Sequence, residues 1–103
     1  MTPLTDDRVR VLVVDDDPRD FELTKCILSR IYGERLLIDW MSDSEAAFGA
    51  IVAGRYDVGL IDHRMPGRDG LWVIREAVGA GCATPLVLFT GLERPGLDVE
   101  ALQ

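Results

Sequence analysis

The 103-residue sequence predicts a single α/β domain built on a parallel sheet. Short aliphatic runs alternate with segments of helical periodicity four times along the chain. Most of these runs lack the apolar–polar alternation of a half-exposed strand, which is typical of strands buried on both faces. Right-handed crossovers would bring the carboxyl ends of the strands to one edge, where ligands bind in open α/β sheets.

The first predicted strand, Val9 to Val14, runs directly into Asp15, Asp16 and Asp17. Asp17 is predicted to cap the following helix, because Pro18 fits the first helical position, where its missing N–H costs nothing. The apolar side of this helix is expected to contain Phe21, Leu23, Thr24, Ile27, Leu28 and Ile31.

Gly33 is expected to end that helix, and Leu36 to Met41 form the second predicted strand. Asp39 within this strand indicates a position near the edge of the sheet. Ser42 and Glu45 have the spacing of a capping box, which predicts that the second helix opens at Ser42. This helix is expected to carry Ala46, Ala47, Phe48, Ile51 and Val52, and to end at Gly54.

The third predicted strand, Val58 to Ile61, terminates on Asp62. A loop over residues 63–69 contains the turn residues Pro66 and Gly67 and leads into a helix that starts at Gly70. Its inward residues are expected to be Leu71, Val73, Ile74 and Val78. A fourth strand, Leu86 to Phe89, stops at Thr90 and Gly91, and a last helix begins over Leu97 to Leu102.

The composition excludes several classes of function. A net charge of −7 and the absence of a basic stripe argue against nucleic-acid binding. No apolar run approaches the ~20 residues of a membrane span, and the polar start is unlike a signal peptide. Cys26 and Cys82 fit no metal-ligand pair and are expected to be reduced core thiols of a cytoplasmic protein, with disulfide pairing as the alternative.

Acidic and hydroxyl side chains follow three of the predicted strands. Asp15 and Asp16 follow the first strand, Asp62 the third and Thr90 the fourth, so all four should meet at one sheet edge. Clustered carboxylates repel one another, and oxygen ligands at this density suit Mg²⁺. The sequence therefore predicts a magnesium site, with Asp17 serving as a helix cap and not as a third ligand.

Three segments together resemble the receiver domain of two-component response regulators: VLVVDDDP, VGLIDHRMPGRDG and PLVLFTG. The resemblance implies a three-layer, flavodoxin-like fold and a phosphorylation switch that is not a turnover enzyme. It also implies that a histidine kinase or phosphotransfer protein is the phosphoryl donor. The implied site consists of the phosphoacceptor Asp62, the Mg²⁺ ligands Asp15, Asp16, Asp62 and the backbone carbonyl of Arg64, and the switch residues Thr90 and Gly91.

The sequence departs from the family pattern at its carboxyl end. The family has a lysine at the end of a fifth strand, whereas the only lysine here is Lys25, within the first helix. We therefore expect residues 1–103 to be one receiver domain with strand order 2-1-3-4, incomplete before the fifth strand and fifth helix. An exposed fourth strand would favour a homodimer, unless the C-terminal segment covers it. Without the lysine, weak or short-lived phosphorylation is expected.

Two other readings are open. A pseudo-receiver would keep the fold as a protein-interaction module that does not depend on phosphorylation. The absent lysine favours this reading, whereas Asp15, Asp16, Asp62 and Thr90 oppose it. A phosphatase of the haloacid dehalogenase kind would also use a strand-end aspartate with an acid two residues on. Arg19 stands where that family requires threonine, which disfavours a phosphatase.

Overall fold

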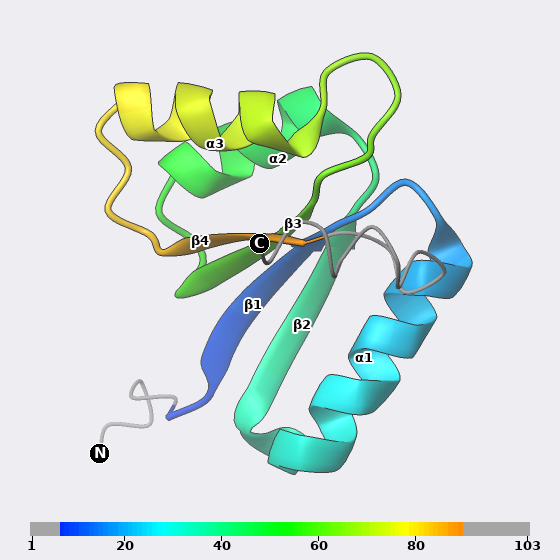
Figure 1. Cartoon of the computed structure of the whole chain (residues 1–103). Coiled ribbons are helices and arrows are strands. Elements are labelled where there is room, and N and C mark those ends of the chain that lie inside the picture. Colours follow the sequence, from blue (N-terminus) through cyan, green and yellow to red (C-terminus); the bar gives the residue numbers. More distant parts are fainter. Residues whose placement is uncertain (1–6, 90–103) are drawn as a thin grey trace, which may run out of the picture.

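A four-stranded parallel sheet with the order β2-β1-β3-β4 forms the centre of the molecule (Figure 1). The computed structural model describes residues 7–89. The strands are β1 (Val9–Val14), β2 (Leu36–Met41), β3 (Val58–Asp62) and β4 (Leu86–Phe89). The helices are α1 (Pro18–Tyr32), α2 (Ser44–Val52) and α3 (Gly70–Gly79), and a 3₁₀ turn (Gly33–Arg35) follows α1. The predicted fold class and strand order are confirmed.

The sheet separates two hydrophobic cores. Figure 1 shows α2 and α3 on one face and α1 on the other. Leu12 and Val14 of β1 point into the core beneath α2 and α3, whereas Val11 and Val13 belong to the core beneath α1. The aliphatic run Val11 to Val14 of β1 is therefore buried on both faces, as the sequence predicts, whereas Val9 and Arg10 are exposed. The residues that follow β1 thus start from a buried, well-packed strand end.

Aspartate residues cap the starts of α1, α2 and α3. Asp17 accepts a hydrogen bond from the Arg19 N–H at 2.8 Å, which confirms the predicted cap of α1. The predicted capping box at Ser42 is wrong. The cap of α2 is Asp43, whose carboxylate accepts the Ala46 N–H at 2.8 Å, so the helix begins at Ser44. Both Ser42 and Asp43 are good capping residues, and the backbone turns one residue later than the spacing indicated.

Several side chains that were expected in the core are exposed. On α1 these are Leu23, Ile27 and Ile31, and Ile31 retains 64% of its accessible surface. The three are spaced by four residues, so they form a stripe that the sheet does not cover. Cys26 is also exposed, which corrects its prediction as a core thiol, and both cysteines are free. Among the apolar residues named for the next two helices, Ala46, Val52 and Val78 are exposed as well.

None of the helices within residues 7–89 is both long and apolar enough to cross a membrane. Thr90, Gly91 and the predicted helix at 97–102 lie outside the described residues.

Candidate functional site

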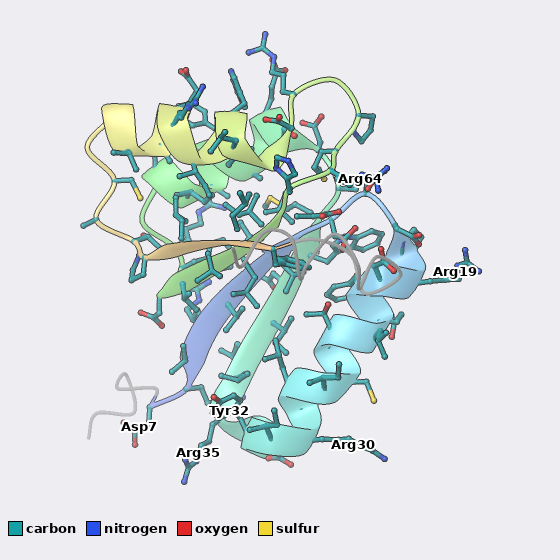
Figure 2. The ribbon with its side chains drawn as sticks, in the orientation of Figure 1. Asp7, Arg19, Arg30, Tyr32, Arg35 and Arg64 are labelled. Atoms are coloured by element: carbon teal, nitrogen blue, oxygen red, sulfur yellow. The ribbon has the colours of Figure 1, made fainter. Side chains whose placement is uncertain are left out.

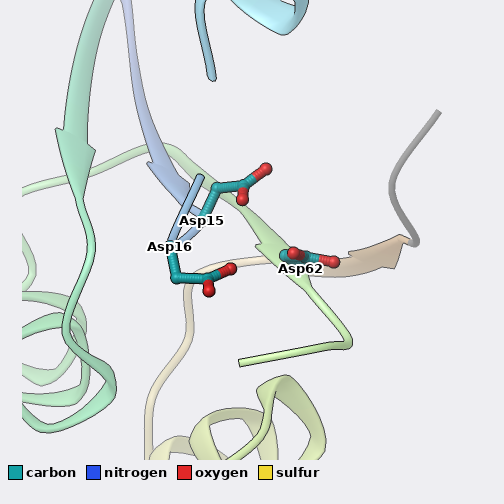
Figure 3. A group of neighbouring side chains, drawn as sticks. All are labelled: Asp15, Asp16 and Asp62. Atoms are coloured by element: carbon teal, nitrogen blue, oxygen red, sulfur yellow. The ribbon is translucent and has the colours of Figure 1, made fainter. Parts of the chain in front are cut away.

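Three carboxylates meet at the carboxyl edge of the sheet (Figure 3). Asp15 and Asp16 follow β1, and Asp62 is the last residue of β3, the strand beside β1. One oxygen from each of the three side chains lies within 4.8 Å of the others. Asp15 and Asp62 are buried, whereas Asp16 is exposed, so the cluster has an inner pair and a solvent-facing member. The structure thus brings together the acids that the sequence singled out.

The neighbouring strand fixes the turn that carries the first two acids. The Asp15 N–H donates to the Met41 carbonyl at 3.1 Å, which extends the ladder between β1 and β2 by one residue. The Asp15 carbonyl accepts the indole N–H of Trp40 at 2.7 Å. Within the turn, the Asp17 N–H donates to Asp15 Oδ1 at 3.0 Å. The backbone and one carboxylate oxygen of Asp15 are therefore held in place.

The other oxygen of Asp15 is left without a partner. Asp15 Oδ2 is buried and has no hydrogen bond within the described part of the chain. Buried polar atoms are almost always satisfied in folded proteins, so an orphaned carboxylate oxygen needs an explanation. A cation shared with the adjacent acids would supply one, since hard oxygen donors suit Mg²⁺ and this ion takes only one or two carboxylates directly.

Burial and mutual repulsion alter the titration of the inner pair. Burial raises the pKa of Asp15 to about 6, and the nearby charges of Asp62 and Asp16 act in the same direction. The pKa of Asp62 is raised as well, mainly by burial, although the hydrogen bond from the Arg64 backbone opposes the shift. Without a cation, the folded protein therefore disfavours full ionisation of the cluster. A divalent ion would reverse this preference.

The loop after β3 is anchored at both of its ends. The Arg64 N–H donates to Asp62 Oδ1 at 3.2 Å, which turns the chain immediately after the acid. The Gly70 N–H then donates to the His63 carbonyl at 3.2 Å, where α3 begins. Near the end of the loop, the hydroxyl of Ser44 donates to the Arg68 carbonyl at 2.6 Å. The loop thus depends on α2 as well as on α3.

The remaining predicted residues are distributed around this cluster. Arg64 is exposed, and Figure 2 shows it at the same end of the molecule as Arg19 near the start of α1. His63 is half-buried, and its Nδ1 has no hydrogen-bond partner among residues 7–89. Lys25 lies on α1, with its ammonium 6.0 Å from the centre of the Phe21 ring. Thr90 and Gly91 fall outside the described residues, so their predicted roles stay predictions.

The sequence did not reveal the residues that support the cluster from outside. Trp40 is one of them, because its indole N–H donates to the backbone carbonyl of Asp15. Ser44 and Arg68 carried no recognisable motif, because a single hydroxyl-to-carbonyl contact between distant segments leaves no spacing pattern. One feature of the sequence could have pointed to Trp40. It is the penultimate residue of β2, the strand that pairs with β1, so it lies beside the end of the strand that leads into Asp15.

Comparison with known families gives a match over nearly the whole chain. The family model of the response regulator receiver domain matches residues 11–103. The probable transcriptional regulatory protein NarL of Mycobacterium tuberculosis is 34% identical over 97 residues, which cover 94% of this chain and 44% of NarL. The transcriptional regulatory protein ResD of Bacillus subtilis is 35% identical over 81 residues, which cover 79% of this chain and 32% of ResD. The chain thus spans less than half of either relative.

Solved structures agree with this match. The receiver domain of the putative response regulator NarL from Mycobacterium tuberculosis superposes with a TM-score of 0.72 at 34% identity, covering 94% of this chain and 77% of that one. The receiver domain of the histidine kinase CKI1 from Arabidopsis thaliana, solved with Mg²⁺ and BeF₃⁻, gives a TM-score of 0.69 at 21% identity. That match covers 92% of this chain and 77% of the CKI1 domain, and it shows a shared fold.

Proposed function

Since the chain belongs to the response regulator receiver domain family, we propose that Asp62 accepts a phosphoryl group from a phosphohistidine. Membership of this family gives the chain a role in phosphorylation-based two-component signalling, as a signalling domain rather than a classical enzyme. The donor in this proposal is a sensor histidine kinase or a phosphotransfer protein. The observation that carries the proposal is the gathering of Asp15, Asp16 and Asp62, with one buried oxygen unpaired.

In this phosphoryl transfer, the carboxylate of Asp62 attacks the phosphorus atom of an anionic phosphoryl group. An oxygen of Asp62 forms the new P–O bond while the P–N bond to the imidazole breaks. The electron pair of the P–N bond stays on the imidazole nitrogen, so the ring leaves as neutral imidazole if its second nitrogen carries a proton. If the second nitrogen carries none, the departing nitrogen takes up a proton from water. Bound Mg²⁺ would screen the charges of nucleophile and phosphoryl group and align them. The residues of this chain orient the nucleophile and would hold the ion for that step.

Each acid has a distinct part in the proposal. Asp15 and Asp16 would hold the ion from the β1 side, and Asp62 and the carbonyl of Arg64 would hold it from the β3 side. The contact between the Arg64 N–H and Asp62 Oδ1 orients the nucleophile and fixes the turn that presents this carbonyl. Because the three acids are close enough to repel one another, ion binding should precede phosphoryl transfer.

The residues that would respond to phosphorylation directly follow β4. Phosphorylation adds charge and acceptor oxygens, and nearby donors can reorganise around them. We assign the hydroxyl of Thr90 and the backbone N–H of Gly91 to this role, because they directly follow β4, which pairs with β3 beside Asp62. Residues 1–103 would act as one cytoplasmic receiver domain.

Phosphorylation by a small donor tests the proposal. Incubation with acetyl phosphate and Mg²⁺ should add one phosphoryl group to a fraction of the protein, since weak or short-lived phosphorylation is expected without the family's lysine. The product is detected as a mass increase and is removed by hydroxylamine, which cleaves acyl phosphates. Asp62→Asn should abolish the increase. Asp57→Asn is the matched control, because Asp57 precedes the opposite end of the same strand and bonds only the Arg10 backbone among the contacts described.

The results of this experiment distinguish a phosphoacceptor domain from a phosphorylation-independent interaction module. Phosphorylation that survives in Asp62→Asn, or that needs no divalent ion, would contradict the proposed site. A chain that binds Mg²⁺ but accepts no phosphoryl group from any donor would instead act as the interaction module considered above.

A further inference from the structure

We propose that Trp40 is a positioning residue for the metal site, which it holds in place through the backbone of Asp15. This inference rests on the proposed function, because it concerns how the Mg²⁺ ligands are fixed. The indole N–H of Trp40 donates to the Asp15 carbonyl at 2.7 Å. Trp40 itself is on β2, one strand away from Asp15 and Asp16 and two strands away from Asp62. It touches no carboxylate of the cluster in the contacts described.

The register of the sheet explains why Asp15 needs this contact. Val14 pairs with Met41, and the Asp15 N–H still reaches the Met41 carbonyl. Continuing the parallel ladder would make the amide of Asp43 the donor to the Asp15 carbonyl. The chain instead leaves the sheet after Met41, and Asp43 becomes the cap of α2. The indole therefore supplies a donor at the point where the backbone ladder ends.

Packing holds the indole in position to donate. The rings of Trp40 and Phe21 stack with centroids 5.1 Å apart and planes inclined by 10°. Phe21 is buried in the core beneath α1, whereas Trp40 keeps 38% of its surface exposed. Phe21 also lies one turn into the helix that Asp17 caps. The stack thus connects the end of β2 to the start of α1, and Asp15 lies on the chain between β1 and that helix.

The consequence is a precise placement of both ligands on the β1 side. Asp15 is held by its N–H, its carbonyl and its Oδ1, whereas its Oδ2 is buried without a hydrogen-bond partner in the described part of the chain. Asp16 follows in the same turn, so its orientation depends on the Asp15 peptide. Partners that orient metal ligands typically affect affinity by about tenfold when they are removed.

Trp40→Phe isolates the hydrogen bond, since phenylalanine can still stack on Phe21 but has no N–H. Trp72→Phe is the matched control, because it is the same chemical change on α3, at the only other tryptophan of the chain. Mg²⁺ titrations followed by NMR on the Asp16 and Asp17 amides should show a dissociation constant about tenfold higher in Trp40→Phe. In Trp72→Phe this constant should stay within about twofold of the wild type.

The wild type provides a second readout that does not depend on the variant folding. The Trp40 indole N–H resonance should exchange slowly with solvent and should shift with the same Mg²⁺ midpoint as the Asp16 amide. An unchanged dissociation constant in folded Trp40→Phe, or a fast-exchanging indole that ignores Mg²⁺, would overturn the inference and leave Trp40 as a packing residue. A wild type that shows no Mg²⁺ response at all would refute the proposed metal site, and the inference with it.

Discussion

At the scale of single residues, the acidic cluster lowers the stability of the fold when no cation is bound. Burial raises the pKa of Asp15 from 3.8 to about 6, so the folded chain favours the protonated carboxyl. A group with a raised folded pKa stabilises the protein fully below its unfolded pKa, and this contribution is lost as the pH rises through the folded value. At neutral pH and without Mg²⁺, Asp15 therefore destabilises the fold relative to a neutral side chain.

Asp15→Asn should show this cost directly. At pH 7.5 without divalent ions, the variant should melt about 5 °C higher than the wild type, because asparagine carries no charge to bury. The difference should vanish near pH 4, where the wild-type carboxyl is largely protonated. Thermal unfolding from pH 4 to pH 8 measures it, with Asp57→Asn as the control that leaves the cluster intact.

Added Mg²⁺ should reverse the order of the two proteins. An ion that binds only the folded state stabilises it by mass action, so the wild type should gain stability and Asp15→Asn should not. If Asp15→Asn is less stable than the wild type at pH 7.5 without Mg²⁺, the account of a strained acidic pair is wrong.

At the scale of elements, the junction between β3 and α3 sets the position of Asp62. Gly70 begins α3 and packs against the backbone of Asp62 and the side chain of Leu88. A Cβ at Gly70 would overlap the Asp62 carbonyl oxygen and would lie 2.9 Å from Leu88 Cδ1. The helix can approach the strand end this closely only because residue 70 has no side chain.

Gly70→Ala should therefore destabilise the domain by about 2 kcal/mol, as overpacking of a filled site does. It should also weaken Mg²⁺ binding, because relief of the overlap moves the Asp62 backbone. Gly79→Ala at the other end of α3 is the control, since a Cβ there meets no atom within 4 Å. Denaturant unfolding measures the free energy of unfolding of both variants and of the wild type. A Gly70→Ala variant as stable as the wild type would show that the junction tolerates a side chain.

At the scale of the whole molecule, α1 covers only part of its face of the sheet. An apolar groove remains between α1 and the β3–β4 side, lined by Thr24, Ile27, Leu28, Leu60, Val87 and Phe89. Within residues 7–89, β4 pairs with β3 alone and keeps Val87 and Leu88 exposed. Unpaired apolar edges tend to associate with other chains.

We expect this 103-residue chain to self-associate through β4 as its concentration rises. Val87→Lys should shift the equilibrium toward monomer, because a charge on an edge strand opposes pairing. Val78→Lys, on the exposed side of α3, should not. Light scattering after gel filtration over a range of concentrations measures the mass, and a wild type that stays monomeric throughout would contradict the expectation.

The buried strands and the acids at their ends could be predicted because both leave local patterns. The aliphatic run before Asp15 fixes a central strand, and pairing of β1 with β3 then brings Asp62 beside it. The side chains that support the cluster could not be predicted, since Trp40 and Ser44 act through single contacts between segments far apart in sequence. The exposed stripe on α1 was misassigned because helical periodicity marks apolar positions and does not show how much of the helix the sheet covers.

The location of the phosphoryl group tests the central claim most directly. Borohydride reduces an acyl phosphate to an alcohol, so a phosphorylated aspartate becomes homoserine and can be identified by peptide mass mapping. After treatment with acetyl phosphate and Mg²⁺, we predict homoserine at position 62 and none in samples that lack Mg²⁺. Homoserine at Asp15 or Asp16, or a phosphoryl group on His63 that borohydride leaves unreduced, would contradict the account.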